Sequence, residues 1–405
     1  MKRITFAFAV AVILASVSFS LEPFGMSSAE AAQKAVRPAL GRPLKEAQAL
    51  AKSGDYRAAL AKVKEANAVS GKSAYENFVV DDFLLFINAK LKDYAAAARA
   101  GEAALATGEV DVKDRPQRLK TLVQLNYTAK SYSAVIAFAK QYQQEAGYDA
   151  DLQMLVTQAY YLQSDYDNAE AAAKALVATT RTAGRKPDES LLQLWLSASF
   201  KKDDNVGSRA ALMALVQDYP TPAYWADLLT LTGRDVGGSD RLTFEIFRLK
   251  LATGTMKSAD DYMEMAQLAI QLGLPGEAES VLAKGFALGA LGRVNKSREL
   301  RLQEMAKQQV AQDKPALGGT AATPKAKAAL GEAYAAYGKY DKAISLYKEA
   351  LSVSFREADL TRLHLGQAHL AEGNAADARK AFAAVKDLKL GQLAHIWLVV
   401  ADQQG

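Results

Sequence analysis

The chain has 405 residues, of which 50% are hydrophobic and 23% charged, so it contains enough apolar material to bury a large core. Its net charge of +5 is mild, and Lys and Arg alternate with Asp and Glu, a pattern that does not favour nucleic-acid binding. The absence of cysteine excludes disulfides, thiol catalysis and iron–sulfur clusters, and three histidines leave little material for a zinc site.

The first 31 residues have the pattern of a cleaved signal peptide. Lys2 and Arg3 precede an apolar stretch at 4–15, and Ala29-Glu30-Ala31 places small residues at the two positions that a signal peptidase reads. We expect cleavage after Ala31 and export to the periplasm of a Gram-negative bacterium, with secretion as the alternative. The apolar stretch is shorter than the ~20 residues that cross a bilayer. An uncleaved anchor is therefore the weaker alternative, and we expect no stable membrane span in the mature chain.

Turns that contain a tyrosine recur along the rest of the chain. The first four of these tyrosines lie 38, 38 and 34 residues apart, and a period in this range is typical of a helical repeat array. An alanine follows each of four turns at the place where two antiparallel helices would approach closely. The turns are Ser53-Gly54-Asp55-Tyr56, Lys92-Asp93-Tyr94, Lys130-Ser131-Tyr132, Ser164-Asp165-Tyr166 and Gly338-Lys339-Tyr340. The alanines are Ala59, Ala97, Ala169 and Ala343.

These units resemble tetratricopeptide repeats, most closely near the C-terminus. The first set of matching positions is Leu330-Gly331, Tyr334, Gly338, Tyr340, Ala343, Tyr347 and Ala350. A second set follows 35 residues later at Leu365-Gly366, His369, Gly373, Ala378 and Phe382. In the middle of the chain the pattern departs from the family, because Asp203-Asp204 stands where a glycine turn is expected. The resemblance implies an all-α fold, a right-handed α-solenoid of antiparallel helix pairs, and an exported bacterial protein of the tetratricopeptide-repeat type.

A run that contains both proline and glycine, at 312–323, interrupts the repeats. We predict a repeat array of about seven units, some degenerate, at 32–311, a linker at 312–323, and a C-terminal repeat pair with a capping helix at 324–405. Because two repeats cannot bury their own faces, we expect the short block to dock on the array or on a partner. The last helix is apolar and contains Trp397. We expect it to cap the array by packing inward, with a docking or self-association surface as the alternative.

The sequence contains none of the common catalytic motifs for zinc hydrolases, serine hydrolases or phosphate-binding loops. His364 and His369 are five positions apart on an expected helix, which rotates them about 140° from each other. His395 lies beside Trp397 in an apolar helix. We interpret His364 and His369 as structural residues, with a metal or catalytic role as the alternative, and His395 as a residue of packing or partner contact. We predict no enzyme activity, no cofactor and no metal site.

In tetratricopeptide arrays the first helix of each unit lines the concave groove, and the resemblance transfers these positions to the present chain. They contain a recurrent amide, at Gln48, Gln124, Gln158, Gln267 and Gln367. Nearby positions contain Phe86, Lys120, Tyr127, Tyr161 and Met263. Amides can both donate to and accept from an extended peptide backbone, and aromatic side chains bury apolar anchors. We predict that this groove binds a peptide or partner segment; the alternative is that the glutamines only form a solvated helix surface.

Together, the resemblance and the expected signal peptide predict a non-enzymatic protein–protein interaction scaffold or adaptor of the bacterial cell envelope. Its expected partner is an envelope protein or peptide, and we expect no nucleic acid. A periplasmic carrier of an apolar small molecule or lipid is the alternative, and a large cavity lined by Phe and Met would favour it. No motif identifies the partner, the pathway or the oligomeric state.

Overall fold

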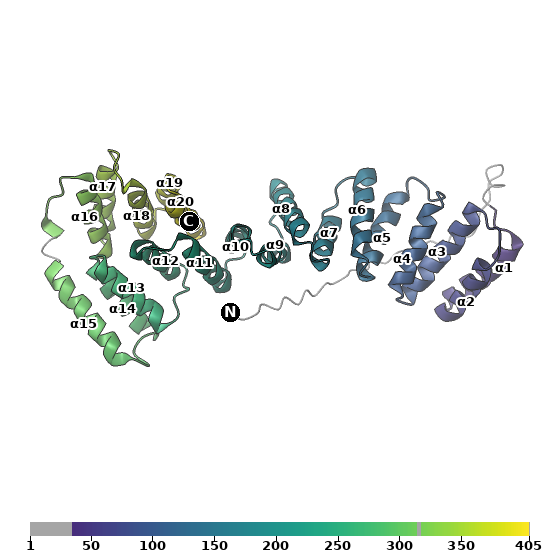
Figure 1. The fold of residues 1–405 in the computed structure, drawn as a ribbon, viewed down its shortest axis with the longest axis horizontal. Helices are drawn as coiled ribbons and strands as arrows, with labels where there is room; N and C mark the ends of the chain where they lie inside the picture. Colours follow the sequence, from purple (N-terminus) through teal and green to yellow (C-terminus); the bar gives the residue numbers. More distant parts are fainter. Residues whose placement is uncertain (1–34, 314–316, 405) are drawn as a thin grey trace. The chain divides into compact units, whose positions relative to one another are not determined.

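The computed structural model describes residues 35–313 and 317–404, and the described chain is helical throughout, with no strand in these ranges. The expected signal peptide, 1–31, lies outside the described residues. The chain forms two compact units. Unit 1 comprises residues up to 187 together with 197–202, and unit 2 comprises 188–196 together with residues from 203 onward. Both units consist of antiparallel helix pairs like those of tetratricopeptide repeats (Figure 1).

Unit 1 contains four helix pairs within its described residues, and the two helices of each pair pack on each other. The pairs are α1 (Pro38–Lys52) with α2 (Tyr56–Asn67), α3 (Ala74–Lys90) with α4 (Tyr94–Ala106), α5 (Arg115–Thr128) with α6 (Tyr132–Ala146), and α7 (Ala150–Leu162) with α8 (Tyr166–Thr182). The next helix, α9 (Glu189–Lys201), contributes residues to both units.

The turns within these pairs share one local chemistry. The residue two positions before the tyrosine adopts a left-handed conformation, and a side chain then caps the second helix in three of the four turns. In the first turn, for example, Gly54 has φ 87°, and the Asp55 carboxylate accepts a hydrogen bond from Ala58 N at 3.0 Å. The left-handed residue ends one helix and the aspartate starts the next. Each tyrosine is the first residue of its second helix.

The first helices of unit 1 approach one another more closely than the second helices do. Helix α1 contacts α3 and α5 contacts α7, although α3 does not contact α5, whereas α2, α4, α6 and α8 make no contacts with one another in the described part of the unit. A stack of helix pairs bends toward the layer in which the spacing is smaller. The surface formed by α1, α3, α5 and α7 is therefore the concave side of this unit, and we call it the first-helix face.

Unit 2 continues the helix pairs and then adds a C-terminal block. Its helices are α10 (Asn205–Asp218), α11 (Pro222–Val236), α12 (Asp240–Ala252), α13 (Ala259–Gln271), α14 (Pro275–Ala287), α15 (Lys296–Asp313), α16 (Pro324–Ala336), α17 (Tyr340–Ala350), α18 (Ala358–Ala371), α19 (Ala375–Ala383) and α20 (Leu388–Gln404). Helix α20 contacts α10, α11 and α12, and α14 contacts α16. The block after residue 323 therefore docks on earlier helices of its own unit.

The departure from the family pattern at Asp203-Asp204 is accommodated without a glycine. Asp203 takes the left-handed conformation itself, with φ 54°, and the Asp204 carboxylate accepts a hydrogen bond from Gly207 N at 2.9 Å. The turn before α10 thus follows the same geometry as the glycine turns, because aspartate tolerates the left-handed region better than most residues with a side chain.

Two glycines of the tetratricopeptide-like pattern, Gly331 and Gly366, allow close contact between the helices of a pair. A Cβ atom on Gly331 would lie 2.8 Å from the ring of Tyr347, and one on Gly366 would lie 2.3 Å from the ring of Phe382. Real Cβ atoms do not approach other atoms so closely, so the aromatic residue of the second helix requires glycine on the first. These contacts explain why Gly331 and Gly366 pair with Tyr347 and Phe382 in the sequence pattern.

Helix α20 packs inward, as expected for a capping helix. Its buried side chains include Leu393, Ile396, Val399 and Val400. Trp397 is 6% exposed, and its ring stacks on Phe382 with 5.9 Å between centroids and an interplanar angle of 16°. This packing closes the end of unit 2 with an apolar contact rather than leaving the helix face open.

Candidate functional site

The predicted groove residues of unit 1 all lie on its first helices. Gln48 is on α1, Gln124 on α5 and Gln158 on α7, and all three side chains are half-buried. In the described part of the chain none of the three amides makes a side-chain hydrogen bond, and Gln158 Oε1 is buried without a partner. The first-helix face thus presents amide groups whose hydrogen-bonding capacity is unused.

Two aromatic candidates of this face, Phe86 and Tyr161, keep surface that a partner could contact. Phe86 is half-buried, with its ring 6.4 Å from that of Tyr56 and with Lys90 Nζ 5.5 Å from its centroid. Tyr161 is also half-buried, and its hydroxyl lies 2.7 Å from Ser197 Oγ. Both rings keep part of their surface exposed and can contribute to an apolar contact.

Tyr127 and Lys120 are more strongly engaged within the chain. Tyr127 is buried against Tyr132, with 6.0 Å between ring centroids, and burial raises the pKa of its phenol to about 12. Lys120 Nζ lies 2.7 Å from Asp149 Oδ2. Tyr127 therefore belongs mainly to the core of its helix pair, and the charge of Lys120 is already balanced.

The candidates of unit 2 do not share one surface. Met263 is 5% exposed and belongs to the hydrophobic core, so it offers almost no area to a partner, whereas Gln267 is exposed to solvent. Gln367 and Trp397 both line a cleft formed by several helices. The structure therefore brings two of the four residues together.

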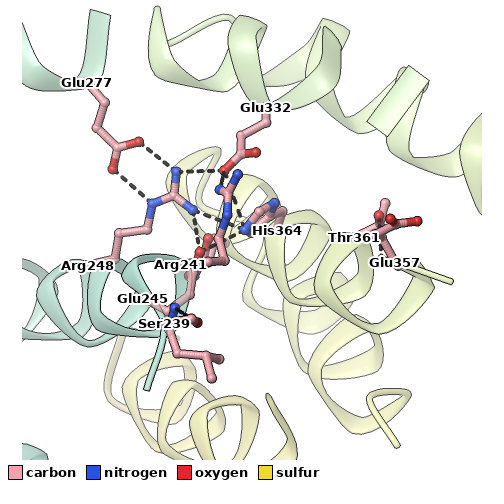
Figure 2. A network of polar contacts seen from close by, with 11 residues as sticks. Ser239, Arg241, Glu245, Arg248, Glu277, Glu332, Glu357, Thr361 and His364 are labelled. Atoms are coloured by element: carbon pink, nitrogen blue, oxygen red, sulfur yellow. Dashed lines mark hydrogen bonds and ion pairs between the residues drawn. The ribbon is translucent and has the colours of Figure 1, made fainter. Parts of the chain in front are cut away.

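A group of buried polar side chains lies beside this cleft (Figure 2). Arg248 is at its centre: Nε and Nη2 donate to the two oxygens of Glu277 at 2.9 and 2.7 Å, and Nη1 donates to Glu245 Oε1 at 2.8 Å. We define the polar cluster as Arg241, Glu245, Arg248, Glu277, Glu332, His364 and Gln367. Its members come from α12, α14, α16 and α18, so it joins the C-terminal block to the earlier helices of unit 2.

The other members complete the hydrogen bonding of two carboxylates. Gln367 Nε2 donates to Glu245 Oε2 at 2.8 Å, and Arg241 donates to Glu332. His364 Nε2 lies 2.8 Å from Glu245 Oε1. His364 Nε2 also lies 3.1 Å from Arg248 Nη1, so the same ring nitrogen faces a carboxylate, which only accepts hydrogen bonds, and a guanidinium, which only donates them. The structural role expected for His364 is thus a polar one, because its buried ring nitrogen contacts a carboxylate.

The charges of the polar cluster stabilise one another. Burial raises the pKa of Glu245, but the neighbouring Arg248 and His364 outweigh burial and lower it. Burial also opposes ionisation of Glu332, and His364, Arg248 and Arg241 again lower its pKa. The pKa of Arg248 rises well above its usual value, because its carboxylate partners outweigh burial. Such a cluster stays charged, and removing one partner leaves a buried charge without compensation.

Three members of the polar cluster also have the geometry of a metal-binding group. Oxygens of Glu245 and Glu332 and a ring nitrogen of His364 lie within 4.8 Å of one another. However, Arg248 and Arg241 already donate to these carboxylate oxygens, and a divalent cation would face both guanidinium charges. The donor set therefore fits an ion-pair cluster better than a metal centre.

The cleft beside the polar cluster has a volume of about 860 Å³, within the range of small-ligand sites. Helices α12, α14, α16, α17, α18 and α20 contribute to its lining. Alanines such as Ala283, Ala335 and Ala368 leave space, and Tyr337 and Tyr340 supply aromatic surface. The aromatic part of the lining therefore consists of Tyr and Trp next to charged groups, rather than of Phe and Met.

The sequence matches no protein-family model and no curated protein. Similar solved structures include a tetratricopeptide repeat protein from Parabacteroides merdae, with 11% identity, 82% of this chain and 99% of that chain covered, and a TM-score of 0.31. A structure of Naa15/Naa10 bound to HypK-THB has 14% identity, covers 86% of this chain and 58% of that chain, and gives a TM-score of 0.32. A structure of yeast Tom70 has 11% identity, with 90% of this chain and 96% of that chain covered, and a TM-score of 0.23. The tetratricopeptide-like description of the helix pairs rests on the turns and glycine contacts of this chain itself.

In the described part of the chain, no helix is both long and apolar enough to cross a lipid bilayer.

Proposed function

We propose that this chain is a non-enzymatic protein–protein interaction scaffold of the bacterial cell envelope, and that the first-helix face of unit 1 binds an extended peptide segment of its partner. The observation that carries the proposal is the set of half-buried amides at Gln48, Gln124 and Gln158, which make no side-chain hydrogen bonds in the described structure. An extended peptide presents N–H and C=O groups in alternation, and an amide side chain can bond either of them.

Gln158 gives this proposal an energetic basis. A buried acceptor without a hydrogen bond costs about 1–3 kcal/mol, and a peptide N–H that donates to Gln158 Oε1 would recover this energy. Phe86 on α3 and Tyr161 on α7 supply half-buried aromatic surface for apolar side chains of the same peptide. Affinity would then come from the backbone and selectivity from the aromatic contacts.

The envelope location rests on the sequence of residues 1–31. We propose a periplasmic protein whose partner is an envelope protein or peptide, with secretion as the alternative. Fractionation of cells that express the full chain tests this part. The mature form, starting after Ala31, is expected in the periplasmic fraction; recovery of an uncleaved chain in the membrane fraction would favour the anchor alternative.

The polarity of the unit 2 cleft argues against the alternative of a lipid carrier. Arg248, Glu277, Glu279 and Lys284 line this cleft together with tyrosines, and an acyl chain in it would lie against charged groups. Burial of such groups against hydrocarbon without hydrogen bonds is unfavourable. The interaction scaffold is therefore the function that we retain.

The test is affinity capture from envelope extract with residues 32–405 as bait, compared with the double variant Gln124→Ala and Gln158→Ala. We expect one partner to bind the unmodified bait and to be reduced about tenfold with the variant, the loss expected for two hydrogen bonds. The matched control is Gln141→Ala with Gln144→Ala, two exposed amides on the second helix α6. Equal capture by the bait, the variant and the control would contradict binding at the first-helix face.

A further inference from the structure

The unit 2 cleft has negatively charged surroundings although the chain as a whole is positive. Glu277 and Glu279 line it. Tyr337, also in the lining, donates to Asp313 Oδ2 at 2.7 Å. Of the two lining cations, Arg248 is already bonded to carboxylates, and Lys284 is exposed to solvent. Counted together with the polar cluster and Asp313, the surroundings of the cleft contain five carboxylates, Glu245, Glu277, Glu279, Glu332 and Asp313, and three permanent cations, Arg241, Arg248 and Lys284.

Glu279 is the carboxylate of this lining that remains without a cation. It is half-buried and forms no ion pair within the described residues. Glu277, in contrast, accepts hydrogen bonds from Nε and Nη2 of Arg248. The pKa of Tyr337 is raised by its burial, by its hydrogen bond to Asp313 and by the charge of Glu279. Glu279 therefore lies in the same lining as Tyr337, and within the described residues no ion pair occupies its carboxylate.

Trp397 provides a second and independent sign of a ligand. Its side chain lines the cleft and is 6% exposed, and its Nε1–H is buried without an acceptor in the described part of the structure. A buried indole N–H normally finds a hydrogen-bond partner. The missing partner is an acceptor, such as a carbonyl oxygen.

We propose that this cleft binds a basic segment of a partner polypeptide, with a lysine or arginine side chain beside Glu279 and a backbone carbonyl that accepts from Trp397 Nε1–H. Tyr337 and Tyr340 also line the cleft, and an aromatic ring can stabilise a nearby cation through a cation–π contact. A peptide satisfies both requirements at once, because it carries an acceptor at every residue next to the charged side chain. An acidic or purely apolar segment satisfies at most one of them.

This site is separate from the one in the proposed function. It is lined by α12 and α14, which are second helices of their pairs, and by the C-terminal block, whereas the first-helix face belongs to unit 1. A partner that used both sites would present an extended segment to one and a basic segment to the other. Different variants therefore test the two proposals: Gln124→Ala with Gln158→Ala tests the first-helix face, and Glu279→Gln and Trp397→Phe test the cleft.

The experiment is isothermal titration of residues 32–405 with three acetylated and amidated pentapeptides, alanine at all positions except the central one. The central residue is arginine, norleucine or glutamate. We expect the arginine peptide to bind at least about tenfold more tightly than the other two at low salt, and to weaken as salt is added. Glu279→Gln and Trp397→Phe should each weaken it about fivefold, the loss of one partly exposed ion pair or one hydrogen bond.

The matched control is Glu264→Gln, an exposed carboxylate on α13 outside the cleft lining, which should leave the affinity unchanged. Circular dichroism of each variant confirms that it is folded. The proposal is overturned if no peptide binds, if the arginine and glutamate peptides bind equally, or if Glu279→Gln has no effect.

One further result would reassign the site. If the arginine peptide loses affinity with Gln124→Ala and Gln158→Ala but not with Glu279→Gln, it binds the first-helix face and this proposal fails.

Discussion

Units 1 and 2 use the same helix pair but treat the amide position of its first helix differently. In unit 1, the half-buried amides of Gln124 and Gln158 make no side-chain hydrogen bonds within the described residues. In unit 2, Gln367 donates to Glu245 and belongs to the polar cluster. A repeat position therefore does not determine a role; what packs over it does.

The difference follows from the path of the chain in unit 2. Helices after residue 323 return to α10, α11, α12 and α14 and place new side chains against them. Charges that are buried in this way seldom add stability compared with apolar side chains, but they tolerate only one relative placement of the helices that they join. We infer that the polar cluster fixes how the C-terminal block docks, whereas unit 1 needs no such device.

Of the variants that test this difference between the units, Arg248→Met is expected to change stability most. The substitution leaves Glu245, Glu277 and Glu332 without their shared cation, and it should destabilise unit 2 by about 3–5 kcal/mol. Urea unfolding followed by circular dichroism measures this loss, and unit 1 should retain its own transition. Lys284→Met, at an exposed position, is the control and should change stability by less than about 0.5 kcal/mol. A loss below about 1 kcal/mol for Arg248→Met would show that the cluster does not hold the block.

A smaller loss of stability is expected from Gly366→Ala. The added Cβ would lie 2.3 Å from the ring of Phe382, so α18 and α19 must separate at a cost of about 1–3 kcal/mol. The midpoint of thermal unfolding measures this cost. Gly391→Ala, in α20 with open space around the new Cβ, should be neutral or stabilising by up to about 1 kcal/mol. Equal midpoints for both variants would refute the close helix contact.

The smallest effect on stability concerns the turns after α3 and α5 of unit 1, where a lysine adopts a left-handed conformation. Lys92 has φ 65° and Lys130 has φ 61°, whereas the turns at Gly338 and Gly373 of unit 2 use glycine. Lys92→Gly should stabilise unit 1 by about 0.5–1 kcal/mol, because glycine avoids the strain of this conformation. Urea unfolding of unit 1 checks the sign. The control Arg99→Gly, at an exposed position inside α4, should destabilise by about 1 kcal/mol, and the same sign for both variants would contradict the strained turn.

The helix pairs could be predicted from the sequence because their signals are local. The tyrosine turns, the aspartate caps and the glycines at 331 and 366 each act within one helix pair, over about 35 residues. The amide row could be placed on first helices for the same reason, although the burial of Met263 and the pairing of Lys120 with Asp149 could not be seen in the pattern. Periodicity indicates which face of a helix a residue occupies, but not what covers that face.

The polar cluster and the cleft were decided by tertiary structure alone. Glu245, Glu277, Glu332 and His364 lie on four helices that are far apart in the sequence, and each looks like an ordinary helix residue in its own repeat. Only the return of the C-terminal block places them within hydrogen-bonding distance and leaves the space beside them. The sequence by itself thus determined the repeating unit, because its contacts are local, and tertiary structure decided the sites that depend on contacts between distant repeats.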